Sequence, residues 1–325
     1  MIMNKIAVLT SGGDAPGMNA AIRAVVRATV YHKKRIMGVQ YGYQGLIDDQ
    51  IVELNARSVK NIINRGGTFL KSYRSKDFME KEGRQKAFET LKKHKIDGLV
   101  VIGGDGSLTG ADIFEKEFGF PCIGIPGTID NDIYGTHYAL GFDTAVNTVI
   151  DAIDKIRDTA SSHSRLFFIE VMGRDAGFIA LYSGIAGGAE AILIPEMLNE
   201  EEKLLKKLKM SKARKKTSNL VVVAEGDQSG GAYELARRVG NRLPGYEIKV
   251  TILGHIQRGG SPTYFDRVLG SRMGVEAAEA LLAGKSNVMV GIKNNKMIHT
   301  PLEKTIKLNP EMNRELLRIA EICSI

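Results

Sequence analysis

Short apolar runs alternate with amphipathic stretches along the chain. Lys5 to Leu9, Gly98 to Ile102 and Leu220 to Ala224 have the length and composition that predict buried strands. Between such runs, apolar residues recur at helical spacing, as in Met18 to Tyr31 and Thr144 to Ser161. Strands that alternate with helices favour parallel sheets covered by helices. The predicted fold class is therefore α/β, with mostly parallel sheets.

The same criteria place the remaining elements. Further strands are expected at 36–40, 121–125, 166–171, 191–195, 248–253 and twice within 288–298, and further helices at 58–64, 84–94, 108–117, 232–242 and 266–282, with others starting after Gly177, at Glu200 and near Pro310. Nearly every chemically rich loop follows a strand, and ligands of open α/β sheets bind beyond the carboxyl ends of the strands. We therefore expect the functional loops to share one edge of each sheet.

Composition and charge narrow the class of protein. The 325 residues, 43% apolar and 25% charged, are ordinary for a soluble globular protein and long enough for two domains. The formal net charge of +8 favours anionic partners such as phosphates, nucleic acid or a membrane surface. Because the chain has no Trp and only 6% aromatic residues, it offers little of the stacking surface that single-stranded nucleic-acid binders use.

The number of cysteines and the hydropathy of the chain indicate the cellular compartment in which the protein is expected. Cys122 and Cys323 form neither a disulfide framework nor a metal-site spacing. The N-terminus has no signal-peptide pattern, and no segment approaches the roughly 20 apolar residues of a membrane span. We expect a cytoplasmic protein that binds neither membrane nor nucleic acid.

The loop Pro126 to Asp132 carries the densest chemistry. Asp130 and Asp132 stand two residues apart behind Gly127 and Thr128, directly after an apolar run. A catalytic loop at a strand end fits this pattern. An Asx-rich turn that caps a helix suits Asp and Asn equally well, and the loop alone leaves both interpretations open.

Two glycine-rich loops also follow predicted strands. The loop Gly103 to Ser107 combines three glycines with Asp105 and a hydroxyl, which suits nucleotide phosphates and Mg²⁺; a turn with Asp105 as a helix cap is the alternative. The loop Thr10 to Gly17 has neither the P-loop nor the dinucleotide-binding spacing. Phosphate binding and a simple tight turn remain equally open for it.

Several cations and one carboxylate lie near other strand ends. These residues are Arg165, Arg174, Glu225, His255 and Arg258. Arginine recognises phosphate through its planar donor fork, although a surface salt bridge is the commoner outcome for a single arginine. Together with Asp105 and Asp130, they are most simply explained by metal-assisted phosphoryl transfer in a cleft between two domains. The basic run from 203 to 216 is expected to be a solvated helix face.

Several motifs occur together in one order along nearly the whole chain. They are Thr10 to Asn19, Gly103 to Ser107, Pro126 to Asp132, Met172 to Arg174 and Gly254 to Pro262. In sequence, order and spacing they closely resemble the bacterial ATP-dependent 6-phosphofructokinases. The resemblance implies a Mg²⁺-dependent enzyme of glycolysis that uses ATP to phosphorylate the 1-hydroxyl of fructose 6-phosphate, giving fructose 1,6-bisphosphate and ADP.

The resemblance also implies a role for individual residues. Asp130 would accept the proton of the 1-hydroxyl, Thr128 and Arg174 would contact the γ-phosphoryl group, and Asp105 and Asp132 would hold Mg²⁺. The implied ATP site is Gly12, Arg74, Ser75, Gly104, Asp105, Gly106 and Ser107, of which Gly12 and Arg74 also count as catalytic. The implied sugar site is Thr128, Ile129, Asp130, Met172, Gly173, Arg174, Glu225, His255, Ile256, Gln257 and Arg258, with Arg165 and Lys249 reaching in from a neighbouring subunit.

The family pattern further implies a homotetramer with a larger ATP-binding domain, 1–140 plus 257–305, and a smaller fructose 6-phosphate domain, 141–256 plus 306–325. ADP would activate and phosphoenolpyruvate would inhibit through an effector site made of Arg23, Arg27, Arg157, Gly188, Glu190, Arg214 and Lys216. Ala56 and Ser218 depart from the family's effector residues, Gln40 stands where a Tyr often lies near the adenine, and Lys249 replaces a usual Arg.

Two other functions compete with this interpretation. Pyrophosphate-dependent relatives typically have Asp at the position of Gly106 and Lys at that of Gly127, so the two glycines favour ATP. A non-catalytic protein that binds nucleic acid through the basic run would show steeply salt-dependent binding. Two carboxylate loops at predicted phosphate sites argue against such a binding module.

Overall fold

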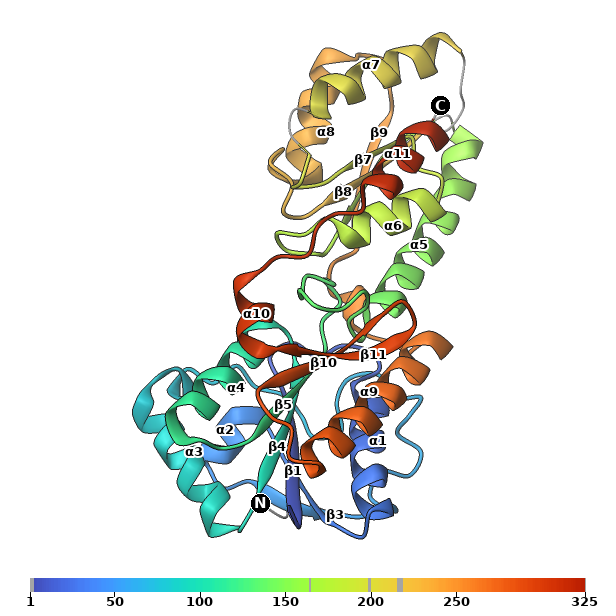
Figure 1. Cartoon of the computed structure of the whole chain (residues 1–325). Coiled ribbons are helices and arrows are strands. Elements are labelled where there is room, and N and C mark those ends of the chain that lie inside the picture. Colours follow the sequence, from blue (N-terminus) through green and yellow to red (C-terminus); the bar gives the residue numbers. More distant parts are fainter. Residues whose placement is uncertain (1–2, 164, 198–199, 215–218, 325) are drawn as a thin grey trace. The chain divides into compact units, whose positions relative to one another are not determined.

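The computed structural model describes residues 3–163, 165–197, 200–214 and 219–324 (Figure 1). The chain divides into two compact units. Unit 1 consists of Met1–Thr144 and Arg258–Pro310, and unit 2 consists of Ala145–Gln257 and Glu311–Ile325. The sequence predicted boundaries near 140, 256 and 305.

A seven-stranded sheet forms the centre of unit 1, in the order β11-β10-β5-β4-β1-β2-β3. Its strands are β1 (Lys5–Ser11), β2 (Arg35–Val39), β3 (Ile51–Leu54), β4 (Gly98–Gly103), β5 (Cys122–Pro126), β10 (Val288–Lys293) and β11 (Lys296–Pro301). The five inner strands are parallel, and the edge strands β3 and β11 are antiparallel to their neighbours. The carboxyl ends of β1, β4 and β5 therefore lie side by side at one edge of the sheet.

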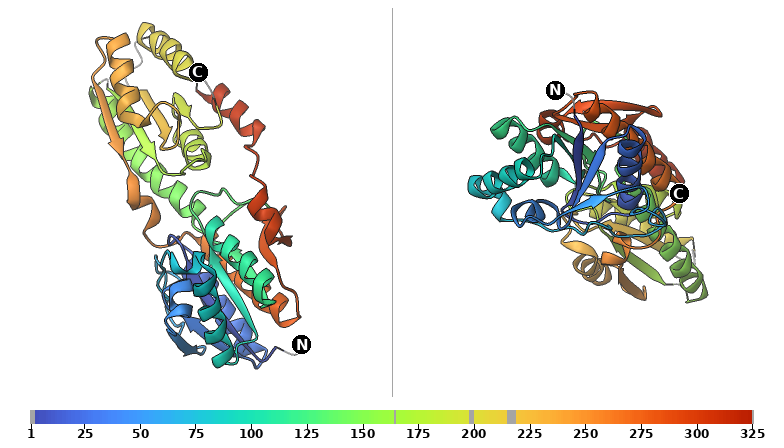
Figure 2. Two further views of the ribbon diagram at one scale, coloured as in Figure 1. Left: turned by 90° about the vertical axis from the view of Figure 1, so that its left-hand side faces the viewer. Right: turned by 90° about the horizontal axis from the view of Figure 1, so that it is seen from below.

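Helices cover both faces of this sheet. Helices α1 (Met18–Tyr31) and α9 (Tyr264–Leu282) pack on one face, and α2 (Gly42–Ile47), α3 (Lys81–Lys93) and α4 (Asp105–Phe118) on the other, as Figures 1 and 2 show. The 3₁₀ turn η1 (Asp77–Met79) and helix α10 (Leu302–Lys307) complete the unit. Glycine allows α1 and α9 to approach closely, because a Cβ atom at Gly274 would lie 2.6 Å from the carbonyl oxygen of Ala21.

Unit 2 has a four-stranded parallel sheet in the order β7-β8-β6-β9. Its strands are β6 (Leu166–Val171), β7 (Ala191–Leu193), β8 (Asn219–Ala224) and β9 (Ile248–Ile252). Helices α5 (Phe142–His163), α6 (Phe178–Ala186) and α11 (Arg314–Cys323) lie on one face, and α7 (Glu200–Ala213) and α8 (Gly231–Arg242) on the other, with the 3₁₀ turn η2 (Gly254–Arg258) after β9 (Figure 1). The predicted α/β class with mostly parallel sheets is confirmed.

Some predicted elements differ in the structure. The helix expected at 58–64 is wrong, because this stretch forms successive turns. Asn55 Oδ1 accepts hydrogen bonds from the backbone N–H groups of Arg57 and Ser58, and Asn61 has a left-handed φ of 57°, which together stop a helix from propagating. The short elements α2, β3 and α10 were not predicted.

The basic run forms an amphipathic helix, as far as the structure describes it. Leu204, Leu205 and Leu208 are buried against the unit 2 sheet, and most of the α7 lysines point to solvent. This arrangement agrees with the predicted solvated face. No helix in the described part of the chain is long and apolar enough to cross a membrane.

A buried carboxylate anchors the start of α5. Asp266 of α9 is fully buried and accepts hydrogen bonds from the backbone N–H groups of Gly141 and Thr144, each at 2.9 Å, and from the Thr144 hydroxyl at 2.5 Å. Burial raises the pKa of Asp266 to about 6, against the opposing effect of these hydrogen bonds, and the nearby Asp143 raises it further.

We expect Asp266 to make stability fall as pH rises from about 4 to about 6. Its folded pKa exceeds its unfolded pKa, so its contribution is fully present below about 4 and lost above about 6. Relative to Asp266→Asn, the free energy of unfolding of the wild type should drop by about 2 kcal/mol over this range. Urea unfolding of both proteins at several pH values measures the difference, in which the other carboxylates cancel. Parallel pH profiles would contradict this expectation.

Candidate active site

The β1–α1 loop and the segment 68–75 meet at the carboxyl end of β1. The Ser72 hydroxyl donates to the carbonyl oxygen of Gly12 at 2.5 Å, and the Thr10 hydroxyl donates to that of Lys71 at 2.7 Å. These bonds hold the segment that carries Arg74 and Ser75 beside the loop. Arg74 is exposed, so its guanidinium is available to an anion at this edge.

The β4–α4 loop lies directly beside the first loop. A Cβ atom at Gly12 would lie 3.3 Å from Ser107 Oγ, so glycine permits the close approach. Asp105 is the exposed first residue of α4, and a Cβ atom at Gly106 would meet no other heavy atom within 4 Å. The positive end of the α4 dipole therefore faces an open region suited to phosphates.

Tyr43, an aromatic residue that the sequence analysis did not single out, supports this region. Its hydroxyl donates to the carbonyl oxygen of Ser107 at 2.7 Å, and its ring stacks on Phe78 with centroids 3.9 Å apart. Tyr43 and Phe78 are far apart in sequence and both buried. No local pattern could have found the pair.

The β5 loop completes the edge in unit 1. The N–H of Gly127 donates to the carbonyl oxygen of Gly103 at 2.9 Å, which fixes this loop beside the β4 loop. Asp130 is buried; its backbone N–H donates to Thr128 Oγ1 at 3.2 Å, and the Thr128 hydroxyl donates to Asp130 Oδ2 at 3.3 Å. A hydroxyl and a carboxylate are thus held together at a strand end.

Asn131 accounts for the turn in this loop. Its amide group donates to the carbonyl oxygen of His137 at 3.1 Å, its Oδ1 accepts from the N–H of Ala139 at 2.7 Å, and its φ is 54°. The next helix, α5, starts only at Phe142. The alternative in which Asp130 or Asp132 caps a helix is therefore wrong.

Asp105 and Asp132 follow the neighbouring strands β4 and β5. Asp105 is exposed and Asp132 is half-buried. Among the described residues, no group of three or more His, Cys, Asp or Glu side chains could hold a metal ion. Mg²⁺ commonly takes one or two carboxylates and keeps several waters, so this pair fits Mg²⁺ better than a metal that needs a full protein cage.

In unit 2, three loops meet beyond the carboxyl ends of β6, β8 and β9. Glu225 Oε1 accepts hydrogen bonds from the N–H groups of Gly173 at 3.3 Å and Arg174 at 2.9 Å, which fixes the turn after β6. Gln257 is buried, and its Oε1 accepts from the N–H of Met172 at 3.2 Å. The side chains of Arg174, His255 and Ile256 remain exposed at this edge, while Ile129 is buried in unit 1.

Arg258, which is predicted to act with His255, is the last residue of η2 and belongs to unit 1. Its Nη1 donates to the carbonyl oxygen of Asp14 at 3.5 Å, and a Cβ atom at Gly13 would lie 2.9 Å from the same nitrogen. Arg258 therefore lies against the β1–α1 loop, one residue beyond the point where the chain leaves unit 2.

Comparison with known proteins covers nearly the whole chain and not only its single motifs. Residues 5–281 match the family model described as phosphofructokinase. The chain belongs to the phosphofructokinase family. The ATP-dependent 6-phosphofructokinase 2 of Bacteroides thetaiotaomicron is 53% identical over 320 residues, which cover 98% of each chain. The ATP-dependent 6-phosphofructokinase of Thermoanaerobacter sp. is 52% identical over 323 residues, which cover 99% of this chain and 100% of that one. The predicted resemblance is thus confirmed.

Solved phosphofructokinases share the fold. The phosphofructokinase structure from Saccharomyces cerevisiae superposes with a TM-score of 0.89 at 34% identity, covering 94% of this chain and 45% of the yeast chain. A pyrophosphate-dependent phosphofructokinase from Marinobacter aquaeolei superposes with a TM-score of 0.84 at 23% identity, covering 99% of this chain and 92% of that chain. The second likeness bears on the fold alone.

In this phosphofructokinase, Arg165 and Lys249 do not lie with the other predicted sugar residues. Arg165 precedes β6 and Lys249 is near the start of β9, whereas Met172, Glu225 and His255 follow the ends of strands in the same parallel sheet. A strand of this length spans about 20 Å. The two cations therefore cannot join those residues around one small ligand within a single unit 2.

The predicted effector residues fall in both units of this phosphofructokinase. On α1, burial and the neighbouring Arg27 lower the pKa of Arg23, which marks a locally cationic surface. In unit 2, Arg157 Nη2 donates to the carbonyl oxygens of Gly187 and, at 2.9 Å, of Gly188. Buried Glu190 accepts a hydrogen bond from the N–H of Leu220 at 2.5 Å.

Four further positions of the effector pattern remain. Arg214 and Ala56 are both exposed. Lys216 and Ser218 lie outside the described residues.

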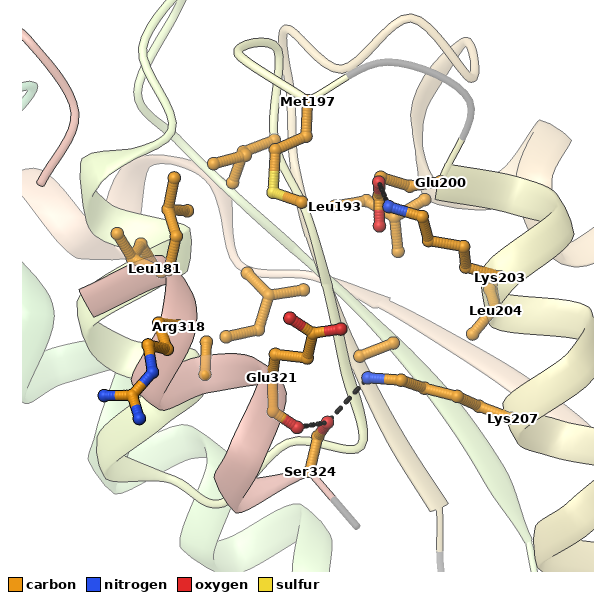
Figure 3. Close-up of a pocket in the computed structure, with 15 residues that line it drawn as sticks. Leu181, Leu193, Met197, Glu200, Lys203, Leu204, Lys207, Arg318, Glu321 and Ser324 are labelled. Atoms are coloured by element: carbon orange, nitrogen blue, oxygen red, sulfur yellow. Dashed lines mark hydrogen bonds and ion pairs between the residues drawn. The ribbon is translucent and has the colours of Figure 1, made fainter. Parts of the chain in front are cut away.

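Unit 2 also holds a cavity of about 250 Å³ between α6, β7, α7 and α11 (Figure 3). Apolar side chains form most of its lining, and none of the predicted site residues lines it. Lys203 pairs with Glu200 at 2.8 Å, and Lys207 donates to Ser324 Oγ at 2.6 Å. Because none of the predicted site residues lines it, the cavity is assigned no part in the chemistry proposed for this phosphofructokinase.

Proposed function

We infer that the chain is an ATP-dependent 6-phosphofructokinase, which transfers the γ-phosphoryl group of ATP to the 1-hydroxyl of fructose 6-phosphate and releases fructose 1,6-bisphosphate and ADP. The observation that carries this inference is the meeting of three loops at the ends of the adjacent strands β1, β4 and β5. They combine an open helix start, two acidic loops and a paired hydroxyl and carboxylate. These are the parts that phosphoryl transfer needs.

In the proposed reaction, the Asp130 carboxylate accepts the proton of the 1-hydroxyl as its oxygen forms a bond to the γ-phosphorus and the bond to the ADP oxygen breaks. Thr128 holds the carboxylate by its side-chain hydrogen bond and contacts the γ-phosphoryl group. Arg174, which is exposed at the end of β6, contributes positive charge to the same group.

Gly12, Arg74, Ser75, Gly104, Gly106 and Ser107 are proposed to bind the ATP phosphates. Asp105 and Asp132 would hold Mg²⁺, which when bound neutralises phosphate charge. The exposed side chain of Asp105 at the start of α4 and the half-buried Asp132 on the next loop supply oxygen ligands and leave room for water.

Fructose 6-phosphate is proposed to bind in a site that includes Thr128, Asp130 and Arg174. The other proposed residues of this site are Ile129, Met172, Gly173, Glu225, His255, Ile256, Gln257 and Arg258. Arg165 and Lys249 are proposed to serve the site of a neighbouring subunit in a homotetramer, since their sheet edge is remote from the other unit 2 residues. A reducing cytoplasm suits the two unbonded cysteines, Cys122 and Cys323.

A coupled assay for fructose 1,6-bisphosphate, run with ATP and with pyrophosphate, tests the function. We expect product with ATP, because Gly106 leaves space beside the start of α4 and neither Gly106 nor Gly127 carries the side chain typical of pyrophosphate-dependent relatives. Product with pyrophosphate and none with ATP would reverse the assignment of the phosphoryl donor. No product with either would overturn the function.

ADP and phosphoenolpyruvate are proposed effectors that bind the cationic residues named above. We expect weaker responses than in the best-regulated relatives, because Ala56 and Ser218 lack the charge-assisted contacts of the family pattern. Titrating each effector at subsaturating fructose 6-phosphate measures the response. Strong responses to both would overturn the expected weakening.

Lys249→Arg is expected to tighten the apparent affinity for fructose 6-phosphate. Arginine donates two parallel hydrogen bonds to one phosphate, whereas lysine acts as a flexible point charge. A gain of roughly 1 kcal/mol corresponds to a KM about five- to tenfold lower. Because the 6-phosphate is remote from the reacting hydroxyl, kcat should change little. Steady-state kinetics of Lys249→Arg and Lys249→Ala test this; an unchanged KM in both variants would remove Lys249 from the site.

A further inference from the structure

Three charged side chains meet at the amino-terminal edge of the unit 2 sheet. Arg165 Nε lies 2.9 Å from Glu247 Oε1, and Lys249 Nζ lies 3.1 Å from the same oxygen. We call Arg165, Glu247 and Lys249 the edge cluster. One carboxylate oxygen therefore contacts both cations that the proposed function assigns to the 6-phosphate of a neighbouring subunit's substrate, although no motif included Glu247.

The backbone of the sheet fixes this meeting. In the parallel ladder Leu166 is paired with Ile248, and the N–H of Leu166 donates to the carbonyl oxygen of Glu247 at 3.1 Å. The residues just before these positions, Arg165 and Glu247, are thereby brought side by side. Glu247 and Lys249 are two residues apart along one extended segment, so their side chains share a face.

The carboxylate is ionised under ordinary conditions. Arg165 first and then Lys249 lower the pKa of Glu247 through their contacts, against a smaller effect of burial. Two cations on adjacent strands repel each other, and an anion between them offsets that repulsion. The side chains of Glu247 and Lys249 are about half exposed, at 50% and 47%, and that of Arg165 is 24% exposed, so a phosphate can reach the cluster from the side of Glu247 and Lys249.

The contact with Glu247 leaves phosphate-binding donors available. Arg165 approaches Glu247 through Nε, while its two terminal amino groups form the part of the fork that can grip a phosphate. Lys249 has three ammonium hydrogens, of which one contact with Glu247 uses one. The carboxylate therefore does not have to leave when a phosphate arrives.

We propose that Glu247 is a positioning residue, which holds Arg165 and Lys249 together as one binding pair for the 6-phosphate of fructose 6-phosphate. The proposal rests on the proposed function. It predicts the direction in which the affinity for fructose 6-phosphate changes: removal of Glu247 weakens binding. If Glu247 instead competed with the phosphate for the two cations, its removal would strengthen binding.

Steady-state kinetics of Glu247→Ala test the direction of this change in affinity. We expect the KM for fructose 6-phosphate to rise about five- to twentyfold with kcat changed less than about twofold, the pattern of lost binding far from the reacting atoms. Glu247→Gln should fall between this variant and the wild type, because an amide oxygen still accepts hydrogen bonds but carries no charge. Glu202→Ala is the matched control: it removes an exposed carboxylate of the same unit, one that pairs with Arg242, and should leave KM unchanged.

A second comparison separates positioning from a general structural role. In an Arg165→Ala, Lys249→Ala background, adding Glu247→Ala should change KM less than about twofold, because nothing remains to position. A structural role would instead persist there and would lower the melting temperature of Glu247→Ala and Glu247→Gln. An unchanged or lower KM in both single variants, with the wild type active, overturns the proposal alone. A wild type that makes no fructose 1,6-bisphosphate from ATP overturns the proposed function.

Discussion

Asp130→Ser is expected to lower kcat by about 10² to 10⁴-fold, the usual contribution of a general base. The side chain is 2% exposed and lies within hydrogen-bond distance of Thr128, so its carboxylate is held at a defined place beside the β4 loop. Serine cannot accept the proton at neutral pH. The KM for fructose 6-phosphate should change little, because the other sugar contacts are intact.

The loop around Asp130 should survive this change. Asn131, through its bonds to His137 and Ala139, and the N–H of Gly127, through its bond to Gly103, hold the loop without using the Asp130 carboxylate. Asp132→Asn is the informative control, since more Mg²⁺ should partly restore its activity and should not restore that of Asp130→Ser. A near-normal kcat in Asp130→Ser, measured in the coupled assay, would exclude the role of Asp130 as the base.

Strand and loop positions could be predicted because they depend on local sequence. The predicted strand at Leu166 to Val171 and the predicted helix at Met18 to Tyr31 coincide with β6 and α1. Hydrophobic runs indicate buried strands, and their alternation with helices indicates parallel sheets, although the order of the strands was not predicted. Once β1, β4 and β5 are neighbours, their polar loops must meet at one edge. The gathering of Gly12, Asp105 and Asp130 in unit 1 was therefore predictable in outline.

Features that depend on distant partners could not be predicted. Tyr43 supports Ser107 and stacks on Phe78, and Arg258 reaches back to Asp14 across the sequence. The contact of Glu247 with Arg165 depends on the register of β6 and β9, which the sequence does not reveal. The helix predicted at 58–64 failed for a local reason, since Asn61 adopts a left-handed conformation that helical spacing does not reveal.

Gly106→Asp should lower kcat/KM for ATP by at least about 10²-fold. Like charges brought together in a binding site cost several kcal/mol, and the new carboxylate would stand where the α-phosphate is proposed to bind. The fold should tolerate the change, because a Cβ atom at Gly106 meets no heavy atom within 4 Å. An acidic residue in the first turn of α4 also interacts favourably with the helix dipole.

Gly106→Asn separates charge from shape, since asparagine has nearly the size of aspartate and no charge. We expect its kcat/KM for ATP to fall much less than that of Gly106→Asp, while both variants keep the wild-type melting temperature. Equal losses would show that space, not repulsion, selects the nucleotide at the start of α4. If neither variant affects ATP use, the ATP phosphates do not lie beside Gly106, and the openness of this position ceases to argue for ATP over pyrophosphate.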